Sequence, residues 1–323
     1  MSKLTRRSLM AGSTALAMTG LNFPNSASAT APAASRQVPG VYRHKVGEFE
    51  VTAVNDGAGK RPLDASFVRN AELEDVQKAL EAAFLPTDTL TISYTPIVIN
   101  TGSRLVLVDT GTGTANPSGG QLMSNLEAAG IDAKAIDTVI ITHFHGDHIG
   151  GLRDAAGELA FPNAEIMVPE AEWAFWMDEG EASRAPEGRK ANFELVRKIF
   201  GPSVKDVKRF EADTEVVAGV TAIAAYGHTP GHTILRVSSG SDEIVLLADT
   251  TNHPALFVRH PTWQAVFDMD GDMAAETRRR VLDMVAAERV TVAGFHFPFP
   301  AIGHIAKDGE GYDLVPIVWQ PKL

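Results

Sequence analysis

Four side chains that could bind metal ions lie within six residues of one another, directly after a β-branched apolar run. They are His143, His145, Asp147 and His148. In an extended backbone, side chains two positions apart point to the same side, so His143 and His145 can reach one ion. The glycine that follows relaxes the backbone and lets Asp147 and His148 turn toward a second ion. Imidazole and carboxylate are zinc-type ligands, and three protein ligands with an open position are typical of catalytic sites.

Three later residues complete this set, because each follows a run typical of a buried strand. They are His228, Asp249 and His296. A lone histidine in such a place is more often a hydrogen-bonded core residue. Together, however, the three put every candidate at the carboxyl end of a predicted strand, where sheet proteins build their sites. His228 can supply a third nitrogen to the first ion and Asp249 can bridge both. Asp109 ends an earlier strand in the same way and is expected to orient a ligand.

The elements that must position these residues alternate between strands and helices. Predicted strands cover residues 48–54, 90–99, 104–108, 138–141, 220–224, 233–238, 243–247 and 290–293. Predicted helices cover residues 121–129, 170–177, 192–200 and 273–287, the last with Asp272 as its N-cap. Strands followed by helices occur twice along the chain. This pattern favours an α/β fold in which two sheets pack face to face with helices outside.

The first 29 residues are typical of an export signal. Arg6 and Arg7 precede a modest apolar stretch, and 27–29 form a small-x-small cleavage signature. The alternatives are a basic tail or a membrane anchor, but the apolar stretch is too short and too weak to span a bilayer. We therefore expect a twin-arginine signal peptide at 1–29, a linker at 30–40 and a catalytic domain at 41–323. The mature protein would be periplasmic or secreted, without stable membrane insertion.

Composition excludes several classes of protein. The chain has 323 residues, of which 44% are hydrophobic, so it can bury a sizeable core in one large or two small domains. The absence of cysteine excludes disulfide scaffolds, cysteine-ligated metal sites and a thiol nucleophile. The formal charge of −11 would become −14 after removal of the signal, and such a surface repels nucleic acids. We expect a small-molecule ester as partner, and the sequence is compatible with a homodimer.

The HxHxDH segment, with its later His, Asp and His, resembles the metallo-β-lactamase superfamily from about residue 40 to the C-terminus. Within that superfamily the chain is most similar to the methyl parathion hydrolase-like branch, which is related to lactonases of the same fold. Four segments carry this closer resemblance: residues 100–111, 159–163, 228–233 and 303–305. The resemblance implies a four-layer αβ/βα sandwich of two mixed sheets flanked by helices.

The resemblance also implies a ligand set for two divalent metal ions, with zinc preferred. One ion would take His143, His145 and His228, the other Asp147, His148 and His296, and Asp249 would bridge them. Zinc β-lactamases commonly have a cysteine where Asp249 stands. Diiron electron-transfer relatives have a glutamate where His145 stands. Both departures argue against those branches.

Aromatic residues line the pocket of methyl parathion hydrolase, and Trp176 and Phe193 match two of them. With Phe175 they form the candidate substrate pocket, although aromatic residues on helices also commonly pack in a core. A third aromatic residue, expected shortly after Gly111, is missing. We therefore expect an altered leaving-group pocket and an altered preference for substrate.

This constellation predicts a dinuclear metal-dependent hydrolase. Two ions would share a water molecule and lower its pKa from 15.7 to about 7. The resulting hydroxide would attack the ester. Asp249 is a candidate proton shuttle. Small, apolar, uncharged lactones or aryl carboxylesters are the expected substrates, and organophosphate triesters are the alternative. A non-catalytic metal-binding or redox protein is a more remote alternative.

Two further patterns are expected to be structural. The aspartates of residues 268–272 mimic the start of a calcium loop, but Arg279 stands where a bidentate glutamate is required. We therefore expect a solvated loop and a helix cap there. The remaining histidines near the candidates are also expected to be structural: His232, His253, His260 and His304.

Overall fold

A computed structural model describes residues 33–35, 37–115, 119–201 and 206–323. Contacts divide the chain into two units, Met1–Gln37 and Val38–Leu323. The division falls inside the predicted linker. The described residues of the first unit lie outside helices and strands, and the predicted signal peptide lies outside the described residues. The following account concerns the second unit.

The described part of the chain contains a first sheet of seven strands in the order β1-β2-β5-β6-β7-β8-β9. Its strands are β1 (Val41–Val46), β2 (Phe49–Val54), β5 (Ile97–Asn100), β6 (Leu105–Val108), β7 (Thr138–Ile140), β8 (Glu165–Pro169) and β9 (Lys208–Phe210). The strands from β6 to β9 are parallel, and the pairs before them are antiparallel. The carboxyl ends of β6, β7 and β8 therefore meet at one edge.

The second sheet, again counted over the described residues, has seven strands in chain order. They are β10 (Glu215–Val217), β11 (Val220–Ala224), β12 (Thr233–Ser239), β13 (Asp242–Leu246), β14 (Thr291–Ala293), β15 (Ile302–Asp308) and β16 (Gly311–Pro316). Its one parallel pair is β13 with β14, while the other pairs are antiparallel. The carboxyl ends of β13 and β14 thus also lie side by side.

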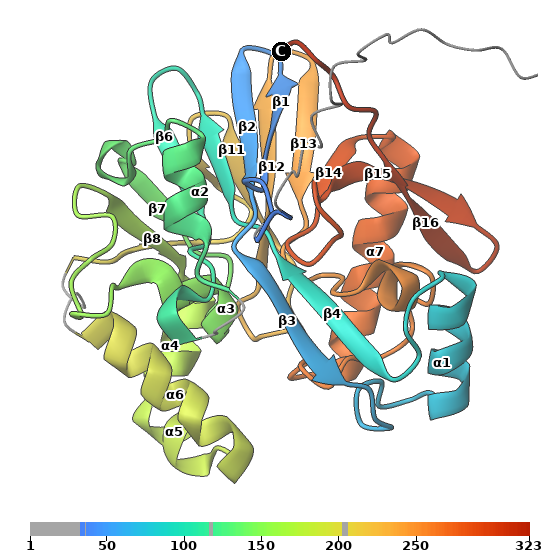
Figure 1. Cartoon of the computed structure of the whole chain (residues 1–323). Helices are drawn as coiled ribbons and strands as arrows, with labels where there is room; N and C mark the ends of the chain where they lie inside the picture. The colour runs from blue at the N-terminus through green and yellow to red at the C-terminus, as the bar shows by residue number, and fades with distance from the viewer. Residues whose placement is uncertain (1–32, 36, 116–118, 202–205) are drawn as a thin grey trace, which may run out of the picture. The chain divides into compact units, whose positions relative to one another are not determined.

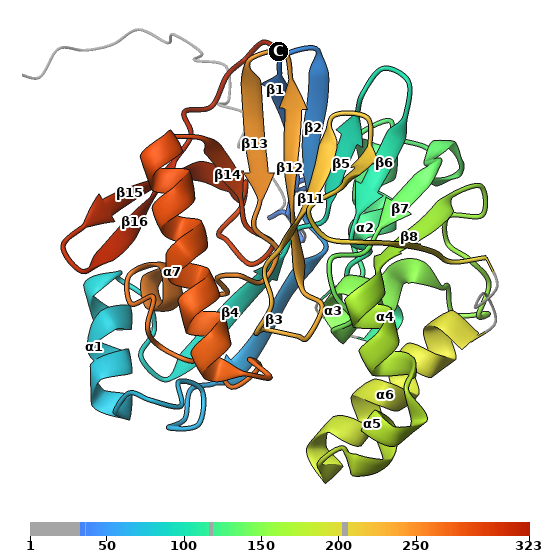
Figure 2. The ribbon, with the colours of Figure 1, turned by 180° about the vertical axis from the view of Figure 1, so that it is seen from behind.

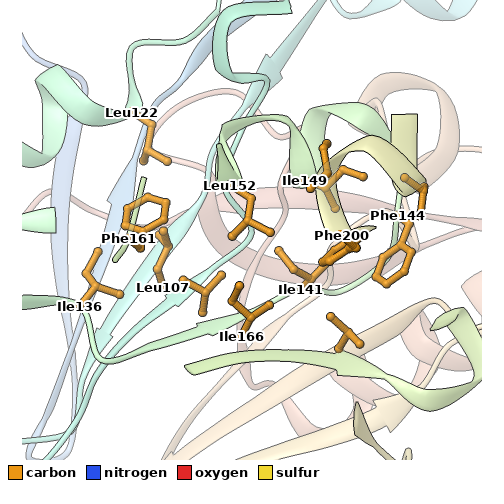
Figure 3. Packing of buried hydrophobic residues seen from close by; sticks show 14 of the residues in the cluster. Leu107, Leu122, Ile136, Ile141, Phe144, Ile149, Leu152, Phe161, Ile166 and Phe200 are labelled. Atoms are coloured by element: carbon orange, nitrogen blue, oxygen red, sulfur yellow. The ribbon is translucent and has the colours of Figure 1, made fainter. Parts of the chain in front are cut away.

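The two sheets pack face to face, and helices cover their outer faces (Figures 1 and 2). Strand alternation explains this packing, because neighbouring residues of one strand point to opposite faces. Val106 and Val108 of β6 join the cluster between the sheets, whereas Leu107 joins the cluster under the helices (Figure 3). With both faces buried, the strand is a continuous apolar run. The predicted four-layer αβ/βα fold is confirmed.

The helices segregate by sheet. The first sheet is covered by α2 (Leu122–Ala128), α4 (Glu170–Met177) and α6 (Glu187–Phe200), and the second by α7 (Gly271–Glu288). The remaining short helices are η1 (Gly113–Ala115), η2 (Ala133–Ala135), α3 (Gly146–Ile149), η3 (Gly150–Leu152), α5 (Glu179–Arg184) and the π-helix η5 (Pro254–Val258). A small antiparallel sheet of two strands, β3 (Gly57–Pro62) and β4 (Thr89–Tyr94), packs with α1 (Leu73–Ala82) and η5 around its own cluster. No helix of the described residues has both the length and the apolar character needed to cross a bilayer.

Three predicted elements differ from the structure. The strand expected at 90–99 is two strands, because Pro96 lacks an amide N–H and the chain leaves β4 for a different sheet at that point. The helix expected at 192–200 begins earlier, at Glu187. Asp270, and not Asp272, is the N-cap of α7, since its carboxylate accepts a hydrogen bond from Met273 N.

A buried carboxylate holds the residues that directly follow β6. Asp56 is fully buried, and its Oδ2 accepts hydrogen bonds of 2.8 and 2.9 Å from the amide and hydroxyl of Thr112. Its Oδ1 accepts a third, of 2.8 Å, from Leu122 N at the start of α2. Gly111 has a φ of +71°, and a Cβ there would lie 2.5 Å from the carboxylate. The carboxylate therefore joins Thr112, just after β6, to the start of α2.

We predict that Asp56→Asn lowers the free energy of unfolding by about 2 kcal/mol. An amide has one acceptor oxygen, so its NH₂ group must face either Leu122 N–H or Thr112 N–H. Urea denaturation of the metal-free chain measures the change. The matched control is Asp88→Asn, an exposed site that should change stability by less than about 0.5 kcal/mol. Equal stability of the two variants would contradict this role for Asp56.

Candidate metal centre

The HxHxDH segment begins where β7 ends and continues into the short helix α3. His143 and His148 are completely buried, while His145 and Asp147 are half-buried. The turn out of the strand is held by Asp109, at the end of neighbouring β6, which accepts hydrogen bonds from both Thr142 N and Thr142 Oγ1. Asp109 has a φ of +60°, a conformation unusual outside glycine and often found at functional sites.

The other three candidates come from the second sheet. His228 follows β11, Asp249 follows β13 and His296 follows β14. Ala248, just before Asp249, has a φ of +43°, so the chain turns sharply as it leaves β13. The structure brings all seven candidates together in two groups that could each hold a metal ion. The first is His143, His145, His228 and Asp249, and the second is Asp147, His148 and His296.

Three ring nitrogens converge in the first group. Nδ1 of His145 lies 3.1 Å from Nε2 of His143 and 2.9 Å from Nε2 of His228. In the second group, Oδ2 of Asp147 lies 3.5 Å from Nε2 of His296 and 3.9 Å from Nε2 of His148. Both groups are therefore compact enough for several donors to reach one point.

Asp249 is a member of the first group and also lies beside the second. Its Oδ2 is 3.3 Å from Nε2 of His228 and 3.0 Å from Nε2 of His296, while its Oδ1 is 3.1 Å from Nε2 of His148. The carboxylate thus contacts one histidine of the first group and two of the second. This is the position that a bridging ligand requires.

Hydrogen bonds on the outer ring nitrogens fix which nitrogen faces inward. Nδ1–H of His148 donates to Asp109 over 2.8 Å, and Nδ1–H of His296 donates to the carbonyl oxygen of Ser93 over 2.8 Å. Nδ1–H of His228 donates to Asp268 over 2.9 Å. Each of these rings therefore presents Nε2 to the centre, as expected for a histidine that binds a metal ion.

The donor set fits a divalent cation. Nε2 of His148 and Oδ1 of Asp249 are buried and make no hydrogen bond with the described residues. Buried polar atoms normally have a partner, so these two atoms mark an incomplete site. Facing lone pairs on the imidazoles of the first group would also repel one another unless a proton or a cation lay between them. Imidazole with carboxylate is the donor chemistry of zinc and similar ions.

Burial, neighbouring charges and hydrogen bonds shift the pKa values of the donors. Burial and the charge of His148 hold the pKa of His143 well below its usual range. Burial also opposes protonation of His228, but its hydrogen bonds to Asp249 and Asp268 outweigh this effect and raise its pKa to about 9. For Asp249, burial opposes ionisation, and the charges of His296 and His148 nevertheless hold its pKa well below its usual range.

Two supporting residues were not predicted from the sequence. The loop at 268–272 was expected to be solvated, but Asp268 is buried and accepts hydrogen bonds from His228 and from Arg278 Nη2 at 3.1 Å. The expectation was wrong for Asp268, which is anchored by a buried guanidinium from α7, but Asp270 and Asp272 are exposed and Asp270 caps α7. His232 accepts a hydrogen bond at Nε2 from Asp249 N and donates from Nδ1 to Ala225 O. Burial, followed by the charge of His228, lowers the pKa of His232 to about 3.

A cavity of about 1060 Å³ opens onto the two groups. Four of the donors line it: His145, Asp147, Asp249 and His296. Apolar side chains form much of the remaining wall, including Ile92, Leu195, Val266, Phe267 and Met269. None of these wall residues was singled out from the sequence, because they come from separate segments without a local motif.

Residues 93–296, which include all seven candidate donors, match the family described as the metallo-beta-lactamase superfamily. The chain belongs to this superfamily. The resemblance drawn from the HxHxDH segment is thereby confirmed, and so is the relation to its lactonases.

Three relatives of this superfamily are informative. An N-acyl homoserine lactonase from a Bacillus species is 26% identical over 196 residues, which are 61% of this chain and 66% of that protein. The match thus spans just under two thirds of that relative. The dizinc quorum-quenching lactonase AidC, solved with the product N-hexanoyl-L-homoserine, is 26% identical with a TM-score of 0.82 over 87% of this chain and 99% of its own. The hydrolase AbOPH is 28% identical, also with a TM-score of 0.82, over 88% and 100%.

In this metallo-β-lactamase fold, the predicted aromatic pocket residues lie apart from the donors. Phe175 and Phe193 line a second cavity, of about 470 Å³, which adjoins the first at Met269. Trp176 is fully buried, lines neither cavity and donates its indole N–H to Glu172. Its surroundings are those of a core residue, which was the other reading of its sequence position.

We predict that the purified chain holds two divalent ions and that Asp249→Ala holds at most one. Asp249 belongs to the first group and also lies 3.1 and 3.0 Å from His148 and His296 of the second, so its loss should affect both sites. Elemental mass spectrometry after dialysis measures the ratio of metal to protein. The matched control is Asp154→Ala, which lines the same cavity but belongs to neither donor group and should retain two ions. Two ions in Asp249→Ala would show that this residue is not a shared ligand.

Proposed function

We propose that this protein is a dinuclear metal-dependent hydrolase of small, mostly apolar lactones or aryl carboxylesters. The observation that carries the proposal is the position of Asp249, between two groups of buried nitrogen donors at the wall of a large cavity. The relatives support it, since AidC is a dizinc lactonase and the Bacillus protein is an N-acyl homoserine lactonase. We propose the seven clustered residues as the ligands and zinc as the ion.

Divalent ions held in these groups would supply Lewis acidity toward an ester oxygen and lower the pKa of a water molecule. The residues of the chain would contribute orientation and proton transfer. Asp109 and Asp268 keep the Nε2 atoms of His148 and His228 directed inward. Oδ1 of Asp249, which makes no hydrogen bond with the described residues, is placed to hold a proton as the leaving group departs.

The cavity wall supports an apolar substrate that is uncharged before cleavage. Ile92, Val266 and Phe267 offer apolar surface in the same cavity as the donors and would displace water from around a bound acyl or aryl group. Arg189 and Lys198 also line the cavity. Cleavage of a neutral ester creates a carboxylate, and these two cations would stabilise that product more than the substrate.

Phosphotriester hydrolysis is the second candidate function. Its support is the resemblance of four sequence segments to methyl parathion hydrolase, together with a donor arrangement that suits attack on phosphorus as well as on carbon. Fold and donors are shared by these chemistries, so the wall of the cavity decides between them. A redox role has less support, because His145 stands where the diiron relatives have glutamate.

The decisive test is a panel of an acyl homoserine lactone, an aryl acetate and a dialkyl aryl phosphate, assayed with the zinc-loaded chain. We expect the highest kcat/KM on the lactone or the aryl acetate. Chelator should abolish turnover and added zinc should restore it. Preference for the phosphate would favour the second candidate instead. Bound metal without turnover of any ester, or iron with reversible redox behaviour, would contradict the proposed function.

A further inference from the structure

A buried glutamate outside both donor groups connects the two loops that supply the first group. Glu172 lies in the first turn of α4 and is completely buried. Both carboxylate oxygens accept two hydrogen bonds each. Burial raises the pKa of this carboxyl, and its hydrogen bonds oppose that increase because they favour the ionised form.

One oxygen of Glu172 binds the loop after β7. Oε1 accepts a hydrogen bond of 2.9 Å from the backbone N–H of Phe144, the residue between His143 and His145. The same oxygen accepts a 2.7 Å hydrogen bond from the indole of Trp176, one turn further along α4. The indole therefore holds the carboxylate in the orientation that reaches the histidine loop.

The other oxygen of Glu172 binds the loop after β11. Oε2 accepts hydrogen bonds of 2.9 Å from Thr229 Oγ1 and 2.8 Å from Gly231 N, just beyond His228. The two backbones also touch, since a Cβ at Gly231 would lie 2.1 Å from Glu172 N. No side chain fits between this loop and α4, so the carboxylate is the polar link across a close-packed contact.

We propose that Glu172 is a positioning residue that sets the spacing between the His143–His145 loop and the His228 loop, and so shapes the first metal site. The proposal rests on the proposed function, in which these residues hold a metal ion. Loss of the Glu172 carboxylate should therefore weaken the first metal site and not the second. In the second group, His148 and His296 are oriented by Asp109 and by Ser93 O, and no hydrogen bond among the described residues joins them to Glu172.

Glu172→Gln is a sharp probe because glutamine has nearly the same shape. Three of the four partners are N–H groups, which cannot accept a hydrogen bond, and they approach both oxygens. Whichever way the amide turns, its NH₂ group faces an N–H. One loop therefore loses its link while the packing of α4 is kept.

The test measures each site in isolation by removing one donor from the other. His296→Ala leaves the first group intact, and His145→Ala leaves the second. Zinc affinity is measured in each background by competition with a chelating dye, with and without Glu172→Gln. We expect Glu172→Gln to weaken zinc about 10- to 100-fold at the first site. At the second site we expect a change of less than about threefold, because its orienting bonds remain.

Two further variants separate positioning from general loss of structure. Glu170→Gln, on the same helix but at the surface, should leave both affinities unchanged. Thr229→Val removes one hydrogen bond on the His228 side and should weaken the first site by a smaller factor, which keeps the test open if Glu172→Gln folds poorly. Circular dichroism of the metal-free variants monitors the fold.

The outcomes distinguish this proposal from the proposed function. If the unmodified chain binds no zinc, the proposed function itself fails. If the chain binds two ions and Glu172→Gln leaves the first site unchanged, the positioning role is overturned while the proposed function stands. Equal weakening of both sites would also overturn it, because the effect would then be a general loss of structure.

Discussion

The central constraint on this structure is the burial of polar donors that face one another without sufficient partners of their own. Nε2 of His148 and Oδ1 of Asp249 lie 3.1 Å apart, and neither makes a hydrogen bond with the described residues. Leaving such atoms buried is costly, so the surrounding protein must hold them in place. It does so through buried groups on the outer side: Asp109, Glu172, His232 and Asp268.

The two-sheet architecture makes this convergence possible. Parallel neighbours bring the ends of β6 and β7 together in one sheet, and the ends of β13 and β14 together in the other. The sheets pack face to face (Figure 1), and donors from both lie close together. A direct link between the sheets reinforces this meeting, because Thr233 N donates to Thr142 O. The apolar strands thus do more than form a core: they fix where each donor leaves the sheet.

Local patterns predicted the donors, whereas long-range contacts determine their support. The HxHxDH segment can be recognised because its members are adjacent, and Asp249 because it ends an apolar strand. Asp268 and Glu172 carry no such signal, since their partners His228 and Thr229 lie 40 and 57 residues away. Asp268 even pointed to the wrong environment, because aspartates in a short polar run are usually solvated. The layered fold was predictable from alternating strands and helices. Which residues of each sheet and helix contact one another was not predictable, because those contacts join distant segments.

Charge balance is a second constraint on the centre. Four carboxylates lie in or beside the donor groups: Asp109, Asp147, Asp249 and Asp268. Their negative charge raises the pKa values of His148, His228 and His296, although burial works against protonation of each ring. A divalent ion competes with protons for these ring nitrogens, so we expect metal binding to release protons. The carboxylates that orient the histidines therefore also supply the negative charge that favours a cation at the centre.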